Sequence, residues 1–172
     1  SRGLGDVYKR QYTGMIVSTR ESAETRKKVL QLGISQISGG SRTSVGGYVE
    51  EEPEEENSAQ FDVSDRRTLD EVVCWLMEMG FVPSFCTACY REGRTGDRFM
   101  KLLKSRQIVN CCHPNALMTL KEYLEDYASD EVKAKGEVLI KQELEKIPNP
   151  VVKQKATEYI ENIHEGKRDF RF

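Results

Sequence analysis

The feature that most constrains this chain is a set of three cysteines, Cys86, Cys89 and Cys112. Two residues separate Cys86 from Cys89, and a pair at this spacing can turn both sulfur atoms toward one centre. Gly93 and Gly96 follow the pair and let the backbone fold over that centre without a Cβ penalty. The spacing therefore predicts a metal site.

We expect Cys112 to close this site from the start of a helix. It stands just before Pro114, which suits a first helical turn, so the dipole of the helix would favour its thiolate. Structural zinc normally takes four protein ligands, with His113 or Cys111 as candidate fourths, whereas a 4Fe-4S cluster can be held by three cysteines and keep one iron open. A two-cysteine redox pair and inert buried thiols are further interpretations of the same spacing.

Composition narrows the class of protein. The chain has 172 residues, 38% of them hydrophobic, and a net charge of −2, which suits one domain core and provides no basic surface for nucleic acid. It contains no apolar run of about eighteen residues and no export leader, so we expect no membrane segment and a cytoplasmic protein. Five cysteines, an odd number, favour a reducing compartment and a metal over a disulfide framework.

The beginning of the chain predicts a parallel strand, helix, strand unit. Residues 1–11 are polar and aperiodic, and we interpret them as a non-native leader, with a short disordered native arm as the alternative. A buried strand at 13–17, a helix at about 21–32 and a second strand at 34–38 form a unit that requires parallel pairing.

Polar side chains follow both of these strands. Ser18 and Arg20 come after the first strand, and Ser38 ends the second. In an α/β barrel this face carries the chemistry, which makes the three residues candidates for a binding site. Taken without that context, Arg20 is a solvated residue at a helix start and Ser38 a turn hydroxyl.

The middle of the chain is polar and then helical. An acidic loop at 49–60 has six glutamates around Pro53, and such a run stays solvated. Thr68 and Glu71 predict a capping box for a helix that Gly80 ends, and Cys74 on that helix is interpreted as a packing residue. Further helices are predicted at 97–104, with its apolar side chains inward, and at 116–127, 129–147 and 150–164.

Longer motifs identify a resemblance. Residues 86–97 (CTACYREGRTGD), 112–116 (CHPNA) and 120–127 (LKEYLEDY) closely resemble the carboxy-terminal part of the HydG family, the radical S-adenosylmethionine (SAM) tyrosine lyases that mature FeFe-hydrogenases. Residues 12–21 (YTGMIVSTRE) and 36–43 (QISGGSRT) are similar to the last barrel strands of that family and of its thiamine- and biotin-pathway relatives.

The resemblance implies a fold and an incomplete protein. Residues 12–80 would be the last strands and helices of a (β/α)8 barrel, including the biotin and thiamin synthesis-associated domain. Residues 81–172 would be a mostly helical region that binds the auxiliary cluster. No cysteines have the three-then-two spacing of the family's radical-generating cluster, so the resemblance implies that the SAM-binding half, with its own 4Fe-4S cluster, is missing and that the chain alone is inactive.

The resemblance also implies a function. In the family, a 5′-deoxyadenosyl radical breaks the Cα–Cβ bond of tyrosine to give p-cresol and dehydroglycine, which yields CO and cyanide. Cys86, Cys89 and Cys112 would hold the auxiliary 4Fe-4S cluster, whose additional labile iron collects both. Arg20, Ser38 and Ser18 would bind the substrate tyrosine, and other maturation proteins would be partners. The alternatives are a thiamine-pathway tyrosine lyase fragment and a stand-alone zinc module.

Overall fold

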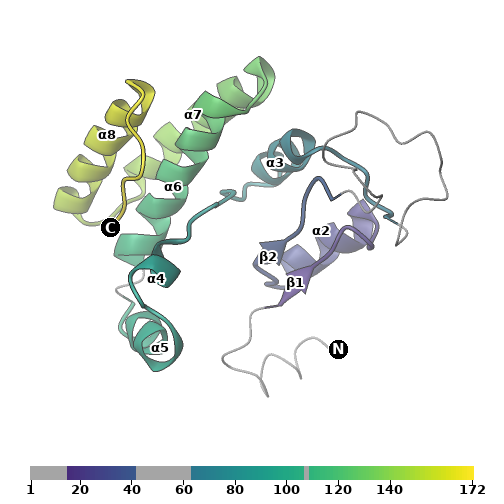
Figure 1. Ribbon diagram of the computed structural model, residues 1–172, viewed down its shortest axis with the longest axis horizontal. Helices are drawn as coiled ribbons and strands as arrows, with labels where there is room; N and C mark the ends of the chain where they lie inside the picture. The colour runs from purple at the N-terminus through teal and green to yellow at the C-terminus, as the bar shows by residue number, and fades with distance from the viewer. Residues whose placement is uncertain (1–14, 42–62, 107–108) are drawn as a thin grey trace. The chain divides into compact units, whose positions relative to one another are not determined.

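A computed structural model describes residues 15–41, 63–106 and 109–172. The expected leader at 1–11 and the acidic loop at 49–60 lie outside these residues. The chain divides inside one helix into two compact units, residues 1–72 and 73–172 (Figure 1).

The first unit contains a parallel strand, helix, strand unit, as the sequence predicts. Strand β1 (Ile16–Val17) pairs in parallel with β2 (Gln36–Ile37), and α2 (Ala23–Gln31) connects them. The Ser22 hydroxyl caps α2 by accepting a hydrogen bond from the Thr25 N–H at 3.3 Å. In the described part of the chain these two strands are all that is seen of the expected barrel, so the α/β class is found but a complete barrel is not.

Helix α3 (Leu69–Glu78) begins with the predicted capping box. The Thr68 N–H donates to Glu71 Oε2 at 2.7 Å, and the Glu71 N–H donates back to Thr68 Oγ1 at 3.3 Å. Gly80, which follows the helix, has a φ of +81° that other residues rarely adopt. Cys74 is half-buried against the core of the second unit, 3.3 Å from Lys135 Nζ, which fits a packing residue.

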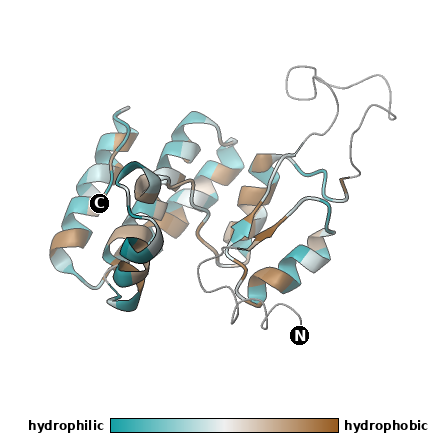
Figure 2. Ribbon diagram, turned by 60° about the horizontal axis from the view of Figure 1, so that its bottom comes forward, coloured by the Kyte–Doolittle hydropathy of each residue, from teal (hydrophilic) through white to brown (hydrophobic). Residues whose placement is uncertain are grey.

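The second unit is helical. The last two helices agree closely with the predicted ranges, and Asn149 caps the second of them, with Pro150 in its first position. Helix α6 packs against both α7 and α8, and hydrophobic and hydrophilic residues alternate along these helices (Figure 2). The helices of this unit after α3 are α4 (Ala88–Arg91), α5 (Gly96–Lys104), α6 (Val109–Asp126), α7 (Asp130–Glu145) and α8 (Pro150–His164).

The core of this unit lies where α6, α7 and α8 meet. Leu117, Leu120 and Leu124 of α6 are almost fully buried, as are Ile140 of α7 and Ile163 of α8. This packing fixes the long axis of α6, which carries Cys112 near its beginning. No helix within the described ranges combines the length and the apolar character needed to cross a membrane.

Helix α5 differs from the prediction. Its apolar side chains were expected to point inward, but none of its residues is buried, and Leu103 is 45% exposed. Phe99, Met100 and Leu102 are only half-buried. The helical period of these residues predicts one apolar face, but it does not specify which surface covers that face.

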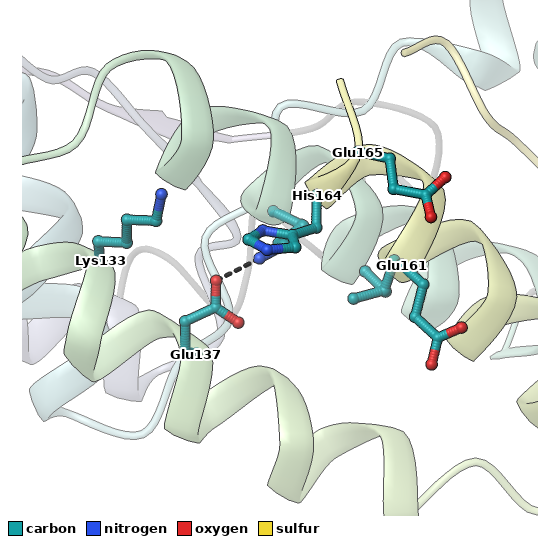
Figure 3. A pocket seen from close by; sticks show the side chains of 7 residues that line it. Lys133, Glu137, Glu161, His164 and Glu165 are labelled. Carbon is teal, nitrogen blue, oxygen red and sulfur yellow. Dashed lines mark hydrogen bonds and ion pairs between the residues drawn. The ribbon is translucent and has the colours of Figure 1, made fainter. Parts of the chain in front are cut away.

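A pocket of about 580 Å³ opens beside α6, α7 and α8 (Figure 3). Lys133 and Glu137 reach it from α7, and His164 reaches it from α8. Its charges are largely paired within the protein: the buried Lys121 forms ion pairs with Glu137 and, at 2.7 Å, with Glu125. No cysteine of the described ranges lines this pocket, so it is separate from the predicted metal site.

Candidate functional site

The segment that carries Cys86 is attached to α6 at its beginning. The Phe85 ring stacks on Tyr123 with 5.0 Å between ring centroids, and the Phe85 N–H donates to Thr119 Oγ1 at 3.2 Å. Just beyond Cys86, the Ala88 N–H lies 3.5 Å from Cys86 Sγ, within hydrogen-bonding distance of sulfur. The Cys86 sulfur therefore already accepts a backbone donor, and α6 holds the segment in place.

The chain turns sharply after Cys89, as the glycines predict. Gly93 has a φ of +61° and Gly96 one of +53°, both in the left-handed region. Between them, the Arg94 N–H donates to the Cys89 carbonyl at 2.7 Å, which closes the turn after α4. The turn fixes the backbone of Arg94 directly beside that of Cys89.

Cys112 lies near the start of its helix. Helix α6 begins at Val109, so Cys111 and Cys112 are its third and fourth residues and Pro114 is inside the helix. Neighbouring residues of an α-helix point about 100° apart, so the two thiols face different directions. Cys112 is exposed and Cys111 half-buried. The helix begins earlier than Pro114 indicates, and Cys112 lies in its first turn, at the helix start as predicted.

The expected ease of forming a Cys112 thiolate is not found. Partial burial of the sulfur, the largest cause, and the nearby Cys89, Cys86 and Cys111 together raise the pKa of the Cys112 thiol to about 11, while Arg94 opposes the rise. The influence of the other cysteines on this pKa indicates that their sulfurs lie close enough to Cys112 to interact with it. A bound cation would attract the negative charges and so favour the thiolate forms.

The types of residue in this region fit a metal centre. Within the described residues, no group of three or more His, Cys, Asp or Glu side chains stands close enough to hold a metal ion. What fits is a set of three thiols, an N–H donor to the Cys86 sulfur, and the buried Nε of Arg94, which has no acceptor in the described chain. His113, a candidate fourth zinc ligand, instead contacts Glu143 Oε2 through its Nε2 at 3.0 Å.

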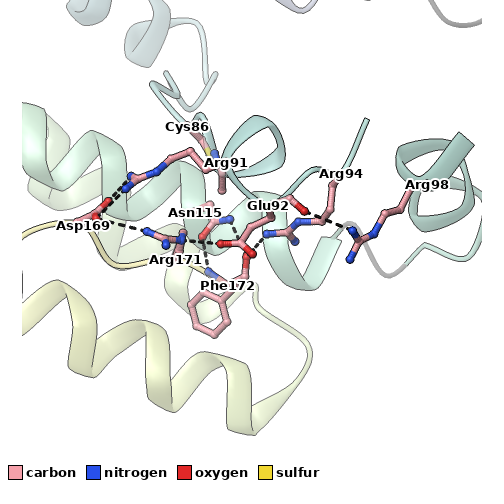
Figure 4. A network of polar contacts seen from close by, with 10 residues as sticks. Cys86, Arg91, Glu92, Arg94, Arg98, Asn115, Asp169, Arg171 and Phe172 are labelled. Atoms are coloured by element: carbon pink, nitrogen blue, oxygen red, sulfur yellow. Dashed lines mark hydrogen bonds and ion pairs between the residues drawn. The ribbon is translucent and has the colours of Figure 1, made fainter. Parts of the chain in front are cut away.

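The end of the sequence, residues 169–172, contacts the cysteine segment (Figure 4), which sequence analysis did not predict. Arg91 forms a two-pronged ion pair with Asp169, and Arg171 Nε lies 2.9 Å from Glu92 Oε1. The Phe172 carbonyl accepts a hydrogen bond from Arg94 Nη2 at 2.8 Å. Arg91, Glu92 and Arg94 all belong to the motif at 86–97, so contacts to the tail explain charges in that motif that the metal hypothesis did not.

The candidate substrate residues lie at the carboxyl ends of β1 and β2. The Ser38 N–H donates to the Val17 carbonyl at 3.0 Å, which continues the parallel pairing. The Arg20 N–H donates to Ser18 Oγ at 3.2 Å, and the Arg20 side chain is exposed. The fold therefore brings Ser18, Arg20 and Ser38 to one edge of the strand pair, as predicted.

A buried ion pair supports this edge and was missed by sequence analysis. Arg26 of α2 is fully buried and pairs with Asp65, and it also donates to the Ser38 carbonyl. Arg67 adds hydrogen bonds to both Asp65 oxygens, at 2.9 and 2.6 Å, and hydrogen bonding by Arg67 is the main cause that lowers the pKa of Asp65 to about 2. Arg26 lies on an otherwise polar helix, where no pattern distinguishes it from a solvated residue.

Comparison with known proteins relates the chain to a domain family and to a solved structure. The family model of the Biotin and Thiamin Synthesis associated domain (BATS) matches residues 10–82. A crystal structure of HydG, described as a maturase of the [FeFe]-hydrogenase, is 49% identical with a TM-score of 0.86 over 94% of this chain. The resemblance to HydG is confirmed. The chain spans 34% of the length of that HydG chain, and comparison with curated proteins finds no match.

Proposed function

We propose that this chain is the carboxy-terminal part of a radical SAM tyrosine lyase that takes part in FeFe-hydrogenase maturation. The complete protein would cleave the tyrosine Cα–Cβ bond to give p-cresol and dehydroglycine. The observation that carries the proposal is the 49% identity to HydG over 94% of this chain.

In this proposal Cys86, Cys89 and Cys112 hold the auxiliary 4Fe-4S cluster. When bound, the cluster supplies an open iron position, with an additional labile iron, for CO and cyanide. The Ala88 N–H would donate to the Cys86 thiolate, and the stacked Phe85 and Tyr123 rings would keep the segment from moving away from α6. Three thiolates from two separate segments would tie α4 to the first turn of α6.

The cysteine assignment is tested by single substitutions in the full-length protein. Cys86→Ala, Cys89→Ala and Cys112→Ala should each lose auxiliary iron and sulfide after anaerobic reconstitution. Cys111→Ala is the matched control, because its side chain leaves the same helical turn about 100° away. Loss at Cys111 with retention at Cys112 would transfer the third ligand, and stoichiometric zinc without sulfide would remove the cluster from the proposal.

We further propose that Arg20, Ser38 and Ser18 bind the substrate amino acid. A guanidinium can hold a carboxylate by two hydrogen bonds, and Arg20 is exposed at the edge where the parallel strands end. In the full-length enzyme, Arg20→Ala should raise the KM for tyrosine roughly tenfold or more, the loss expected for a charge-assisted hydrogen bond. Lys28→Ala is the control, because Lys28 is exposed on α2 and pairs with Glu24 of the same helix. Unchanged KM and kcat in Arg20→Ala would refute the assignment.

Two rival functions are weaker. A zinc module that uses His113 would have to give up the contact between His113 and Glu143 or bind through the other ring nitrogen. A thiamine-pathway lyase shares the BATS region and the first reaction step. The set of Cys86, Cys89 and Cys112 argues against it, because that function does not account for these three cysteines. Metal analysis of the reconstituted protein separates the first rival, and detection of bound CO and cyanide by infrared spectroscopy separates the second.

A further inference from the structure

Arg94 is held by hydrogen bonds from its backbone and from the tip of its side chain, but its Nε–H has no acceptor among the described residues. Its backbone N–H donates to the Cys89 carbonyl at 2.7 Å, and Nη2 donates to the Phe172 carbonyl at 2.8 Å. Its Nε is buried and has no hydrogen-bond acceptor in the part of the chain that the structure describes. Buried donors in proteins nearly always have an acceptor, so this one calls for a physical reason.

Arg94 differs from the neighbouring arginines of this network in its partners. Arg91 pairs with the side chain of Asp169, and Arg171 pairs with that of Glu92. The Arg94 side chain instead binds the main-chain oxygen of Phe172 through Nη2, and its Nε–H is left over in the described part of the chain. This N–H therefore belongs to a side chain whose backbone is hydrogen-bonded to that of Cys89.

The network around Phe172 holds the guanidinium in this place. Asn115 is buried on α6, one turn after Cys112, and its Oδ1 accepts from the Phe172 N–H at 2.9 Å. The Asn115 amide also donates to the Phe172 carbonyl at 3.4 Å, the same oxygen that binds Arg94 (Figure 4). Asn115 thus couples Arg94 to the helix that provides the third cysteine.

We propose that Arg94 is a positioning residue for the auxiliary cluster, with its Nε–H donating to a cluster or cysteine sulfur. This inference rests on the proposed function. A cluster bound by three thiolates is anionic, and its sulfurs accept N–H hydrogen bonds. Such donors raise the reduction potential, because they stabilise the more negative reduced form.

The test uses the full-length protein with the radical-SAM cluster removed by alanine substitution of its cysteines. Arg94→Gln should retain auxiliary iron and sulfide but shift the midpoint potential to lower values in an EPR-monitored titration. Arg98→Gln is the matched control, since Arg98 is exposed and its Nη1 contacts the Glu92 carbonyl at 3.4 Å. Its potential should stay at the wild-type value. The inference is overturned if the midpoint potential of Arg94→Gln equals those of the wild type and of Arg98→Gln.

A second measurement needs no substitution at Arg94. In wild-type protein carrying ¹⁵N-labelled arginine, pulsed EPR of the reduced cluster should detect a nitrogen coupling that Arg98→Gln retains. Absence of that coupling would overturn the inference even if Arg94→Gln failed to fold. Failure of the proposed function looks different: the wild-type protein would then incorporate no auxiliary iron and sulfide at all.

Discussion

Removal of the Asp65 carboxylate should destabilise the strand pair far more than removal of Arg67. The Arg26 side chain is 0% exposed and that of Asp65 2% exposed, whereas Arg67 is 25% exposed. Asp65→Ala leaves the Arg26 guanidinium buried without its carboxylate, a change that costs about 3–5 kcal/mol. Arg67→Ala keeps the buried pair and should cost about 1–2 kcal/mol, because water can replace its hydrogen bonds.

The causes of the lowered Asp65 pKa place the two arginines in the opposite order of importance. A hydrogen bond from Arg67 is the largest cause of its lowering, ahead of the charge of Arg26. We expect stability to follow burial, because a charge left without a partner at full burial cannot be rescued by solvent.

The same carboxylate predicts a pH dependence of stability. The folded pKa of Asp65 is about 2, below the value of about 3.9 for an unfolded chain. Between these values the unfolded state binds more protons, so stability is fully present above pH ~4 and falls as the pH drops toward about 2. The loss amounts to about 2–3 kcal/mol in wild type and should be absent in Asp65→Ala.

Hydrogen exchange of peptides from residues 15–41, in the full-length protein, measures these effects locally. A cost of about 3 kcal/mol accelerates exchange about 100-fold where opening is local. Peptides from α7 serve as the internal control, because they belong to the other compact unit. The reasoning is refuted if Asp65→Ala exchanges no faster than Arg67→Ala.

Two further predictions concern packing and the acidic loop. An added Cβ at Gly136 would lie 2.4 Å from Leu124 Cδ1, so Gly136→Ala should destabilise the protein in urea by about 1–2 kcal/mol even after the gain in helix propensity. Exposed Val138→Ala is the control; a more stable Gly136→Ala would contradict this packing. Deletion of residues 50–56, six glutamates and a proline, should change Tm by no more than a few degrees because such a run adds nothing to a core, and a larger drop would show that the loop is structural.

The sequence predicted those parts of the fold that depend on local chemistry. The capping box of Thr68 and Glu71 was confirmed atom by atom, since both partners lie three residues apart. Pro150 marked the start of α8 for the same reason. The parallel pairing of β1 and β2 was also predicted correctly, because a helix between two short apolar runs leaves few other connections.

Contacts between residues far apart in the sequence could not be predicted. Arg26 and Asp65 are 39 residues apart, and Asn115 and Phe172 are 57 apart. Each of the buried members, Arg26 and Asn115, is a polar residue whose burial only the folded chain reveals. No spacing rule connects such pairs, so the support of both candidate sites had to come from the structure.

Pro114 explains why the helix start was misplaced, and its true position bears on the metal site. Proline is tolerated in a first turn, which suggested that α6 begins near it, but it is the sixth residue of a helix that begins at Val109. At that position it cannot donate to the Asn110 carbonyl, so one helical hydrogen bond is missing directly after the two cysteines. The turn with Cys111 and Cys112 is therefore held less firmly than the buried part of α6. If Cys112 holds the proposed cluster, we therefore expect the first turn of α6 to adapt to it while Leu117, Leu120 and Leu124 keep the rest of the helix packed in the core.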